Sequence, residues 1–292
     1  MVTKTMKTLR EYFHEAKIGK WAIGHFNFST ADQLRAIVEA AAELDLPVMA
    51  ATSEGEANFI GYKQAVALVK SYQEEGYKVF LNADHHKSWE AAKAAIDAGY
   101  DSVLIDASKL AFEENVALTK KVVNYAQEMA KSSGREITVE GELGYLKGSS
   151  EVQKKVEISK DDFTKPEEAK IFVAQTGVDR LAIVFGNIHG IVTEQEEHLD
   201  IDALKGIAAA VPDVVLVLHG ASGLKSEEIK AAIQNGILNI HINTELRVAY
   251  HQALRKKLEE EPEQTTPYKF LEPSYKATKE VVLEKLKLFR NL

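Results

Sequence analysis

The sequence predicts a (β/α)₈ TIM barrel, and three observations carry this prediction. Short apolar segments alternate with longer amphipathic ones along the chain. The apolar segments are numerous enough to close a barrel, at 21–27, 46–52, 78–84, 102–106, 137–143, 180–186, 214–220 and 237–243. The length of 292 residues is near the roughly 250 of a typical one-domain barrel. We therefore expect one domain over residues 1–292, with a doubly wound open sheet as the alternative.

The strand segments are apolar for most of their length, as in WAIGHFN (21–27) and VVLVLHG (214–220). Such strands are typical of a parallel sheet buried on both faces. The segments between them have helical periodicity, and several end at glycine, the usual C-terminal stop. Helices are expected at 31–44, 63–75, 88–99, 115–131, 165–177 and 226–236. Further helices are expected within 1–17 and at 276–289, the latter packing outside the barrel or against a neighbouring subunit.

Composition excludes several classes of site and partner. The absence of cysteine excludes disulfides and thiolate metal sites. A net charge of -8 without a basic block argues against nucleic acid. No apolar run reaches the roughly 18 residues of a membrane span, and the N-terminus lacks the apolar core of a signal peptide. We expect a cytoplasmic protein.

One segment departs from the alternation of strands and helices. Residues 144–165 are polar, contain glycine and follow the fifth strand. Loops of this length in compact domains are usually functional or disordered.

Three histidines are expected to meet at the carboxyl ends of the strands, where the active sites of α/β barrels lie. His85, His189 and His219 follow the third, sixth and seventh strands, and Glu142 lies in the fifth. A metal ion or a shared anion accounts for such a gathering. Nitrogen and oxygen donors suit Zn²⁺ best, with Co²⁺, Mn²⁺ or Fe²⁺ as alternatives. The sequence therefore predicts a divalent metal site.

The other histidines have different expected places. His86 follows His85 directly and is expected to point away from the metal, although the reverse assignment is an alternative. His25 and His241 lie within strands, where a structural role and a site role both fit. The rest fall in helical or loop segments and are expected at the surface: His14, His198 and His251.

Glycine-containing turns predict a phosphate site. Gly190 and Gly220 allow close approach of the backbone, and helix starts offer free N–H groups to an anion. Ser222 follows the seventh strand, and Asn243-Thr244 opens the helix after the eighth. Barrel phosphate sites are often built from these two loops.

The order and spacing of these motifs resemble the class II, metal-dependent ketose-bisphosphate aldolases over nearly the whole chain. The motifs are GHFNFST, SEGE, NADHH, DAGYDSVLIDASKLAFEENV, VEGELG, GVDRLAIVFGNIHG, LVLHGASG and INTELR. The resemblance implies that Asp84 is catalytic and that the metal ligands are His85, Glu142, His189 and His219. It also implies that Gly190, Gly220, Ser222, Asn243 and Thr244 hold the phosphate of dihydroxyacetone phosphate, and that Asn27 and Ser53 line the substrate pocket.

The implied reaction is the reversible cleavage of fructose 1,6-bisphosphate to dihydroxyacetone phosphate and glyceraldehyde 3-phosphate. Zn²⁺ or another divalent ion would act as a Lewis acid, with a monovalent cation as an optional second cofactor. Asp84 would be the general base at the C4 hydroxyl. Glu151, on the long loop, is the nearest candidate for handling the enediolate proton. The resemblance also implies a homodimer or homotetramer.

Four departures from the family pattern concern substrate recognition. Thr193 stands where the family commonly has lysine, and His241 where it commonly has asparagine. Thr266-Pro267-Tyr268-Lys269 replaces an Asp-Pro-Arg motif, and Gly148-Ser149-Ser150-Glu151 replaces a Gly-Gly-acidic run. Tagatose 1,6-bisphosphate or another phosphorylated ketose is therefore an alternative substrate. A catalytically silent barrel that binds metal and phosphate is a further alternative, whereas a Schiff-base aldolase is disfavoured because no lysine ends a strand.

Overall fold

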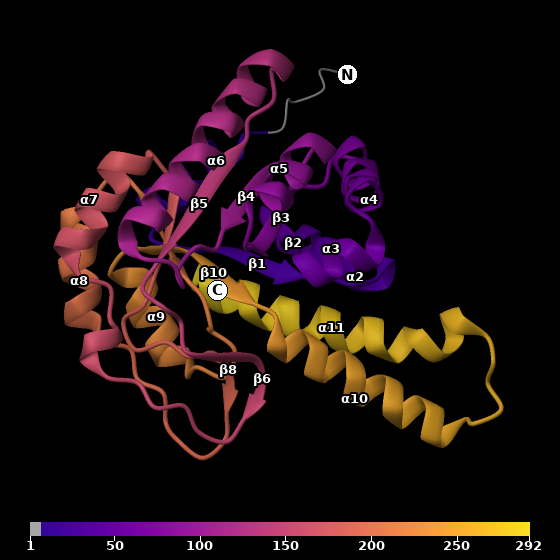
Figure 1. Ribbon diagram of the computed structural model, residues 1–292. Coiled ribbons are helices and arrows are strands. Elements are labelled where there is room, and N and C mark those ends of the chain that lie inside the picture. Colours follow the sequence, from indigo (N-terminus) through magenta and orange to yellow (C-terminus); the bar gives the residue numbers. More distant parts are fainter. Residues whose placement is uncertain (1–6) are drawn as a thin grey trace.

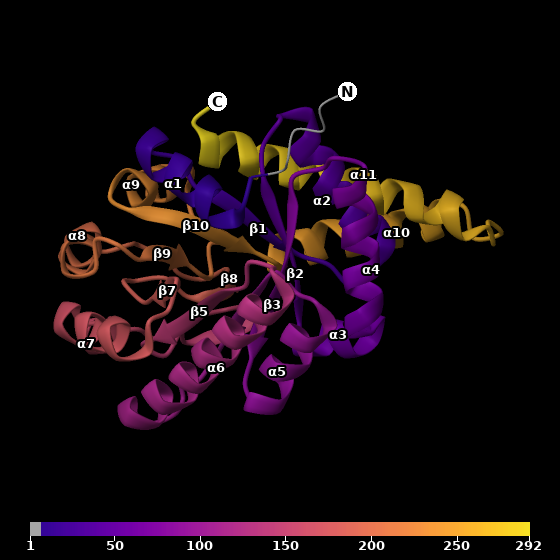
Figure 2. The ribbon, with the colours of Figure 1, turned by 90° about the horizontal axis from the view of Figure 1, so that it is seen from above.

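Eight parallel strands close into a barrel in the order β1-β10-β9-β7-β5-β4-β3-β2. The computed structural model describes residues 7–292, and Figures 1 and 2 show the strands inside a layer of helices. The strands are β1 (Ile23–Asn27), β2 (Val48–Ser53), β3 (Val79–His86), β4 (Ser102–Ile105), β5 (Thr138–Leu143), β7 (Arg180–Ile183), β9 (Val215–Leu218) and β10 (Ile237–Ile242). Each overlaps a predicted strand, and β3 runs two residues beyond the predicted end to include His85 and His86. The barrel is confirmed, and the open-sheet alternative is wrong because β1 pairs with both β2 and β10.

The outer helices follow the strands in the alternation that the sequence predicts. They are α2 (Ala31–Glu43), α3 (Glu54–Ile60), α4 (Tyr62–Glu74), α5 (Trp89–Ala98), α6 (Phe112–Ser133), α7 (Pro166–Thr176), α8 (Ile201–Ala210) and α9 (Ser226–Gln234). The C-terminal ends of these helices show why several of them stop at glycine. The C-cap of α5 is Gly99 with φ 113°, a left-handed conformation that side chains other than glycine rarely adopt.

The N-terminal helix α1 (Leu9–Gly19) closes the end of the barrel opposite to the strand carboxyl ends. Thr8 and Glu11 form a capping box at its start. Its apolar face, which includes Tyr12 and Phe13, packs against Phe80 and Leu238 near the beginnings of β3 and β10. The predicted N-terminal helix is therefore confirmed for this range, and residues 1–6 lie outside the described residues.

Two antiparallel helices, α10 (Thr244–Glu260) and α11 (Pro267–Arg290), form a hairpin that projects beyond the barrel (Figure 1). The helix α11 packs on α10, α2 and β1, with the rings of Phe26 and Phe289 at 6.4 Å. It lies outside the barrel, as expected, but begins at Pro267 rather than at residue 276, because proline is favoured in the first turn of a helix. Within residues 7–292 no helix is long and apolar enough to cross a membrane.

The barrel interior is more polar than the strand sequences suggest. Arg180 is fully buried, and its Nη1 lies 2.6 Å from Glu140 Oε2 and 2.7 Å from Asn239 Oδ1. Its Nη2 donates to Asn82 Oδ1 at 3.0 Å and to Ser102 Oγ. A desolvated ion pair persists only with such additional hydrogen bonds. The mostly apolar strand segments therefore gave no indication of this buried polar network.

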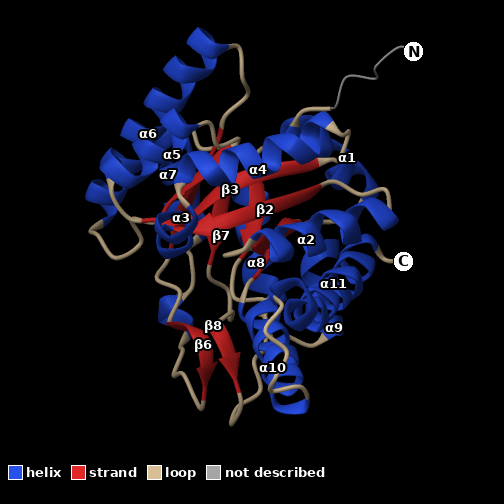
Figure 3. Cartoon of the chain, turned by 90° about the vertical axis from the view of Figure 1, so that its right-hand side faces the viewer, coloured by secondary structure: helices blue, strands red, loops and turns tan. Residues whose placement is uncertain are grey.

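The segment 144–165 is ordered rather than structureless. Its strand β6 (Gly148–Gln153) pairs in parallel with β8 (His189–Val192), which follows β7, and a short 3₁₀ helix, η1, spans Lys160–Asp162. Figure 3 shows this small sheet outside the barrel and beside α10. The segment therefore reaches the mouth of the barrel next to the loops where the phosphate site is expected.

A candidate active site at the carboxyl ends of the strands

A cavity of about 620 Å³ opens at the carboxyl ends of the barrel strands. This volume is within the roughly 300–1,000 Å³ that small-molecule sites commonly have. Every residue predicted for the site lines it except Glu151: Asn27, Ser53, Asp84, His85, Glu142, His189, Gly190, His219, Gly220, Ser222, Asn243 and Thr244. The barrel topology thus brings the predicted residues together from loops far apart in sequence.

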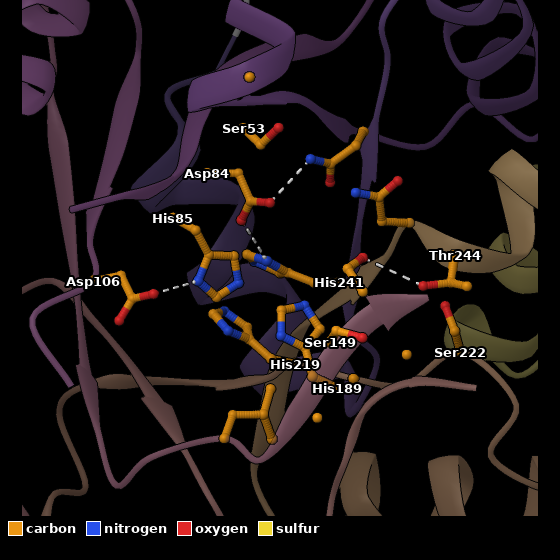
Figure 4. Close-up of a pocket in the computed structure, with 18 of the residues that line it drawn as sticks. Ser53, Asp84, His85, Asp106, Ser149, His189, His219, Ser222, His241 and Thr244 are labelled. Atoms are coloured by element: carbon orange, nitrogen blue, oxygen red, sulfur yellow. Dashed lines mark hydrogen bonds and ion pairs between the residues drawn. The ribbon is translucent and has the colours of Figure 1, made fainter. Parts of the chain in front are cut away.

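The three predicted histidine ligands lie close together in the cavity (Figure 4). One donor atom each from His85, Glu142 and His219 lies within 4.8 Å of the others. The Oε2 atom of Glu142 is 3.5 Å from His85 Nδ1 and 3.4 Å from His219 Nδ1. His189 joins from the loop after β7, with its ring centre 5.2 Å from that of His85. These side chains could hold one divalent ion.

Two buried atoms of this cluster have no hydrogen-bond partner among the described residues: Glu142 Oε2 and His219 Nδ1. Buried polar atoms are rarely left unpaired, because desolvation without a partner costs about 1–3 kcal/mol. Both atoms face each other across the gap where an ion would lie. The donor set therefore fits a divalent metal.

Two further carboxylates orient the imidazoles of the cluster. Asp106 Oδ2 lies 3.0 Å from His85 Nδ1, and Asp106 is itself fixed by Ser108 Oγ at 2.7 Å. Glu140 Oε1 lies 2.7 Å from His219 Nε2. Sequence patterns place these acids at or near strand ends but predict no role for them. A carboxylate behind a ligating histidine is a common second partner of metal sites, and this is the signal that could have found them.

The protonation of the histidines depends on these contacts. Burial and the nearby imidazoles of His85 and His219 lower the pKa of His189 to about 3, so it is neutral at pH 7. Burial opposes protonation of His85, but the charge of Asp84 and the bond to Asp106 raise its pKa to about 9. Burial likewise opposes protonation of His219, whereas Glu140 and Glu142 raise its pKa well above the usual value. The carboxylates around His85 and His219 thus favour a positive charge at this cluster.

The backbone separates the roles of the two adjacent histidines. His85 has φ 44°, a left-handed conformation uncommon for residues with a side chain. This turn directs His85 into the cavity. His86 instead lies 3.1 Å from the carbonyl oxygen of Asp84 and 3.1 Å from Tyr62 Oη. The structure thus brings His85, rather than His86, to the cluster.

Asp84 lies beside the histidine cluster in a fixed orientation. Its Oδ2 accepts from Asn27 Nδ2 at 2.9 Å, and its Oδ1 is 3.4 Å from His241 Nδ1. Asn27 Nδ2 also donates to Glu56 Oε2 at 2.9 Å. Burial opposes ionisation of Asp84, but the charge of His85 and the contact with His241 hold its pKa well below the usual range. The side chain is therefore a carboxylate at neutral pH.

His25 and His241 stack on each other with ring centres 3.4 Å apart. Burial lowers the pKa of both, and each is neutral at pH 7. His241 lines the cavity and stacks on His219 at 4.3 Å, whereas His25 is held behind it by Asn82 at 2.9 Å. His241 is therefore part of the site wall and His25 supports it. The remaining histidines are exposed, as expected: His14, His198 and His251.

The predicted phosphate-binding residues lie on the side of the cavity formed by the loops after β7, β9 and β10. Gly220 has φ 67°, and a Cβ there would lie 2.0 Å from the carbonyl oxygen of Ile188. Gly190 has φ 95°, and its Cβ would lie 2.2 Å from that of Ser149. Backbone packing alone therefore requires these glycines. Thr244, the first residue of α10, is buried at the same side.

The small β6–β8 sheet is fastened to this side of the cavity. Ser150 Oγ lies 3.3 Å from Thr244 Oγ1, and Arg247 Nη2 donates to Ser150 Oγ at 2.9 Å. Arg247 lines the cavity one turn after Thr244 on α10, and sequence patterns predict no role for it. It adds a cation to the side where the phosphate is expected.

Three positions singled out in the sequence do not line the cavity. Glu151 is exposed on β6, although its neighbours Ser149 and Ser150 reach the cavity. Thr193 is exposed and bonds the carbonyl oxygen of Gln153 at 3.2 Å. Tyr268 is 73% exposed at the start of α11. None of these three side chains thus belongs to the cavity wall of this chain.

Comparison with known proteins shows the family of the chain. The family model described as "Fructose-bisphosphate aldolase class-II" matches residues 7–292. A fructose-bisphosphate aldolase of Geobacillus stearothermophilus is 36% identical over 296 residues, covering 98% of this chain and 97% of the relative. A 6-phospho-5-dehydro-2-deoxy-D-gluconate aldolase of Bacillus licheniformis is also 36% identical, covering 97% and 94%. The solved structure of the YdjI aldolase from Escherichia coli K12 superposes with a TM-score of 0.80 at 34% identity, covering 96% of each chain. The chain belongs to the class II fructose-bisphosphate aldolase family and is an aldehyde-lyase.

Proposed function

We propose that this aldolase cleaves fructose 1,6-bisphosphate reversibly to dihydroxyacetone phosphate and glyceraldehyde 3-phosphate, with Zn²⁺ as its first-choice metal. One observation carries the proposal. The Asp84 carboxylate lies beside the cluster of His85, Glu142 and His219, in one cavity with glycine turns and a helix start suited to phosphate. A site that only bound metal and phosphate would need no ionised carboxylate held next to the ligands.

The metal would be held by His85, Glu142, His189 and His219. A bound divalent ion supplies a Lewis acid for the ketone oxygen of the substrate. Asp106 and Glu140 fix the ring orientations of His85 and His219, and this keeps one nitrogen of each ring available as a ligand. Co²⁺, Mn²⁺ and Fe²⁺ suit the same donors.

Asp84 would act as the general base on the C4 hydroxyl during cleavage and return the proton in the reverse direction. The hydrogen bond from Asn27 holds one carboxylate oxygen and leaves Oδ1 to face the cavity beside His241. Ser53 would contact the substrate from the end of β2. Glu151 would handle the enediolate proton only if the β6–β8 sheet moved toward the cavity.

The phosphate of dihydroxyacetone phosphate would bind at Gly190, Gly220, Ser222, Asn243 and Thr244. The start of α10 presents free backbone N–H groups and the positive end of a helix dipole. Arg247 adds a positive charge one turn later. These groups support binding of a dianion without any further lysine.

Tagatose 1,6-bisphosphate or another phosphorylated ketose is the second candidate substrate. His241 lines the cavity where the family commonly has asparagine, and it contacts Asp84, which would act at the C4 hydroxyl. Fructose and tagatose differ in configuration at this carbon. One relative is named for a phosphorylated deoxygluconate, so the family includes other substrates.

The deciding experiment is a coupled cleavage assay on fructose 1,6-bisphosphate and tagatose 1,6-bisphosphate, with and without EDTA. We expect cleavage of the fructose compound, loss of activity with EDTA and recovery with Zn²⁺. Cleavage that persists in EDTA would contradict the metal-dependent mechanism, and faster cleavage of the tagatose compound would favour the second candidate. The proposal includes a cytoplasmic homodimer or homotetramer, for which light scattering gives the mass.

A further inference from the structure

Two lysines lie on loops that adjoin each other at the cavity. Lys87 follows β3, and Lys109 lies on the loop after β4. These strands are paired, and the backbone N–H of Asp106 donates to the carbonyl oxygen of His86 at 2.8 Å. Both lysines line the cavity. They therefore contribute two positive charges to one part of its wall.

This part of the wall lies across the barrel from the proposed phosphate loops. In the closed strand order, β3 is opposite β9 and β4 is opposite β10. Ser222 and Thr244 follow β9 and β10, so the two lysines and the phosphate loops are on opposite sides of the mouth. Figure 4 shows the corresponding arrangement, with Asp106 on one side of the histidine rings and Ser222 and Thr244 on the other. The proposed reaction centre lies between them.

Neither lysine is neutralised by a carboxylate among the described residues. The Lys109 ammonium lies 5.1 Å from the ring centre of Tyr145, which also lines the cavity. Lys87 contacts an acid only through its backbone, whose N–H donates to Glu54 Oε2 at 3.4 Å. By contrast, Lys147 on the neighbouring loop is paired with Asp162 at 2.9 Å. Lys87 and Lys109 are thus available to an anion.

The acidic side chains of the cavity disfavour an anionic substrate end that has no cation beside it. Glu56, Asp84, Asp106 and Glu142 all line it and repel an incoming anion. A ketose held by its first phosphate at α10 would extend past Asp84 toward the ends of β3 and β4. Its far end would arrive at the lysines.

We propose that Lys87 and Lys109 bind the second phosphate of the substrate, an assignment that rests on the proposed function and specifies its substrate as a bisphosphate. Two lysines match a phosphate monoester, which carries about -1.5 to -2 charges at pH 7, better than they match a single carboxylate. The charges that recognise this phosphate come from the loops after β3 and β4.

The test compares fructose 1,6-bisphosphate with fructose 1-phosphate, which lacks the second phosphate. We expect the wild-type enzyme to prefer the bisphosphate in kcat/KM. Lys87→Met and Lys109→Met should each lower kcat/KM for the bisphosphate about tenfold, since each removes a hydrogen bond to a charged group. The double variant should lose about 100-fold, and kcat/KM for fructose 1-phosphate should stay unchanged. Lys70→Met, on the exposed face of α4, is the matched control and should change neither value.

Two results would overturn the assignment: a wild-type enzyme without preference for the bisphosphate, or a double variant that keeps the wild-type preference. Affinity for fructose 1,6-bisphosphate in EDTA, measured by calorimetry, separates this assignment from the proposed function. A wild-type protein that cleaves neither compound would contradict the function. Weaker binding of fructose 1,6-bisphosphate by the double variant than by Lys70→Met would still support the assignment of the second phosphate to the lysines. Equal binding by the two proteins would contradict this assignment.

Discussion

Glu140 Oε1 lies 2.7 Å from His219 Nε2, and the opposite ring nitrogen, Nδ1, is 3.4 Å from Glu142 Oε2. The second oxygen of Glu140 pairs with Arg180 at 2.6 Å, and both side chains are fully buried. A line of alternating charges therefore runs from the barrel interior to the candidate metal site. Because Glu140 accepts from Nε2, it fixes the tautomer in which Nδ1 is available as a ligand.

Glu140→Gln should weaken metal binding about 10- to 100-fold, which is the usual effect of losing such a partner. The amide keeps a hydrogen-bonding group next to His219 but removes the charge that favours a cation. Chelator competition measures the affinity. Glu136→Gln is the control, because Glu136 pairs with Arg10 far from the candidate site. Equal metal affinity in the two variants would exclude a role for Glu140.

Removal of a ligand should have a larger effect. His189→Ala and His219→Ala should lose tightly bound metal, because each removes one nitrogen donor from a site that has few protein ligands. Metal content after dialysis is the measurement. Near-stoichiometric zinc in both variants would contradict the proposed ligand set.

The adjacent histidines give a matched pair of variants. His85→Ala should lose its metal, whereas His86→Ala should keep it, because His86 is bound to Tyr62 and to the backbone of Asp84. The same dialysis experiment decides between them. The opposite result would assign the ligand to His86 and would require a different path of the chain after Asp84.

Much of the fold could be predicted because each strand and helix has a local signal. Apolar runs locate the strands, and glycines such as Gly99 locate helix ends. The β6–β8 sheet could not be predicted, since β6 is polar and pairs with a strand about forty residues later. The polar barrel interior was missed for a similar reason. Arg180 is the first residue of its strand, a position where an exposed charge is common. Only the closed barrel brings Glu140 and Asn239 into contact with it.

The candidate site likewise has features that a local sequence pattern predicts and others that depend on contacts between distant segments. Strand-end positions predicted which residues meet, because parallel strands in a barrel end on one side. Orientation could be predicted only for the adjacent pair, in which His86 was expected to point away from the metal. The left-handed backbone of His85 and the exposed side of β6 that carries Glu151 depend on contacts among several loops.

Metal binding should release protons. In the metal-free protein the pKa of His85 is about 9, so the ring is protonated at pH 7 and must lose its proton to become a ligand. Affinity for Co²⁺ should therefore rise about tenfold per pH unit between pH 6 and 8 for each proton released, and level off above pH 9. Calorimetry in buffers of different ionisation enthalpy counts the protons. Affinity independent of pH over this range would contradict the protonated state.

Asp84→Ala should retain metal and substrate affinity while kcat falls on the order of 10²–10⁴-fold, the usual contribution of general base catalysis. Asp84 touches Asn27 and His241 but lies outside the proposed ligand set. Steady-state kinetics and metal content together make the test. Loss of metal along with activity would place Asp84 among the ligands instead.

The loop acid gives the last prediction. Glu151→Ala should slow exchange of the enediolate proton more than it slows carbon–carbon cleavage, because Glu151 is the first acid after the Gly148 turn. Gly148 has φ 100°, a conformation that glycine permits and that a hinge could use. Ser150 now ties the strand to Thr244 and Arg247, so Glu151 would reach the substrate only after these contacts rearranged. Exchange between dihydroxyacetone phosphate and tritiated water is the measurement, with Glu157→Ala as the control on the same segment. Exchange at the wild-type rate in Glu151→Ala would remove this residue from the mechanism, and a selective loss in Glu157→Ala would transfer the role to the later acid.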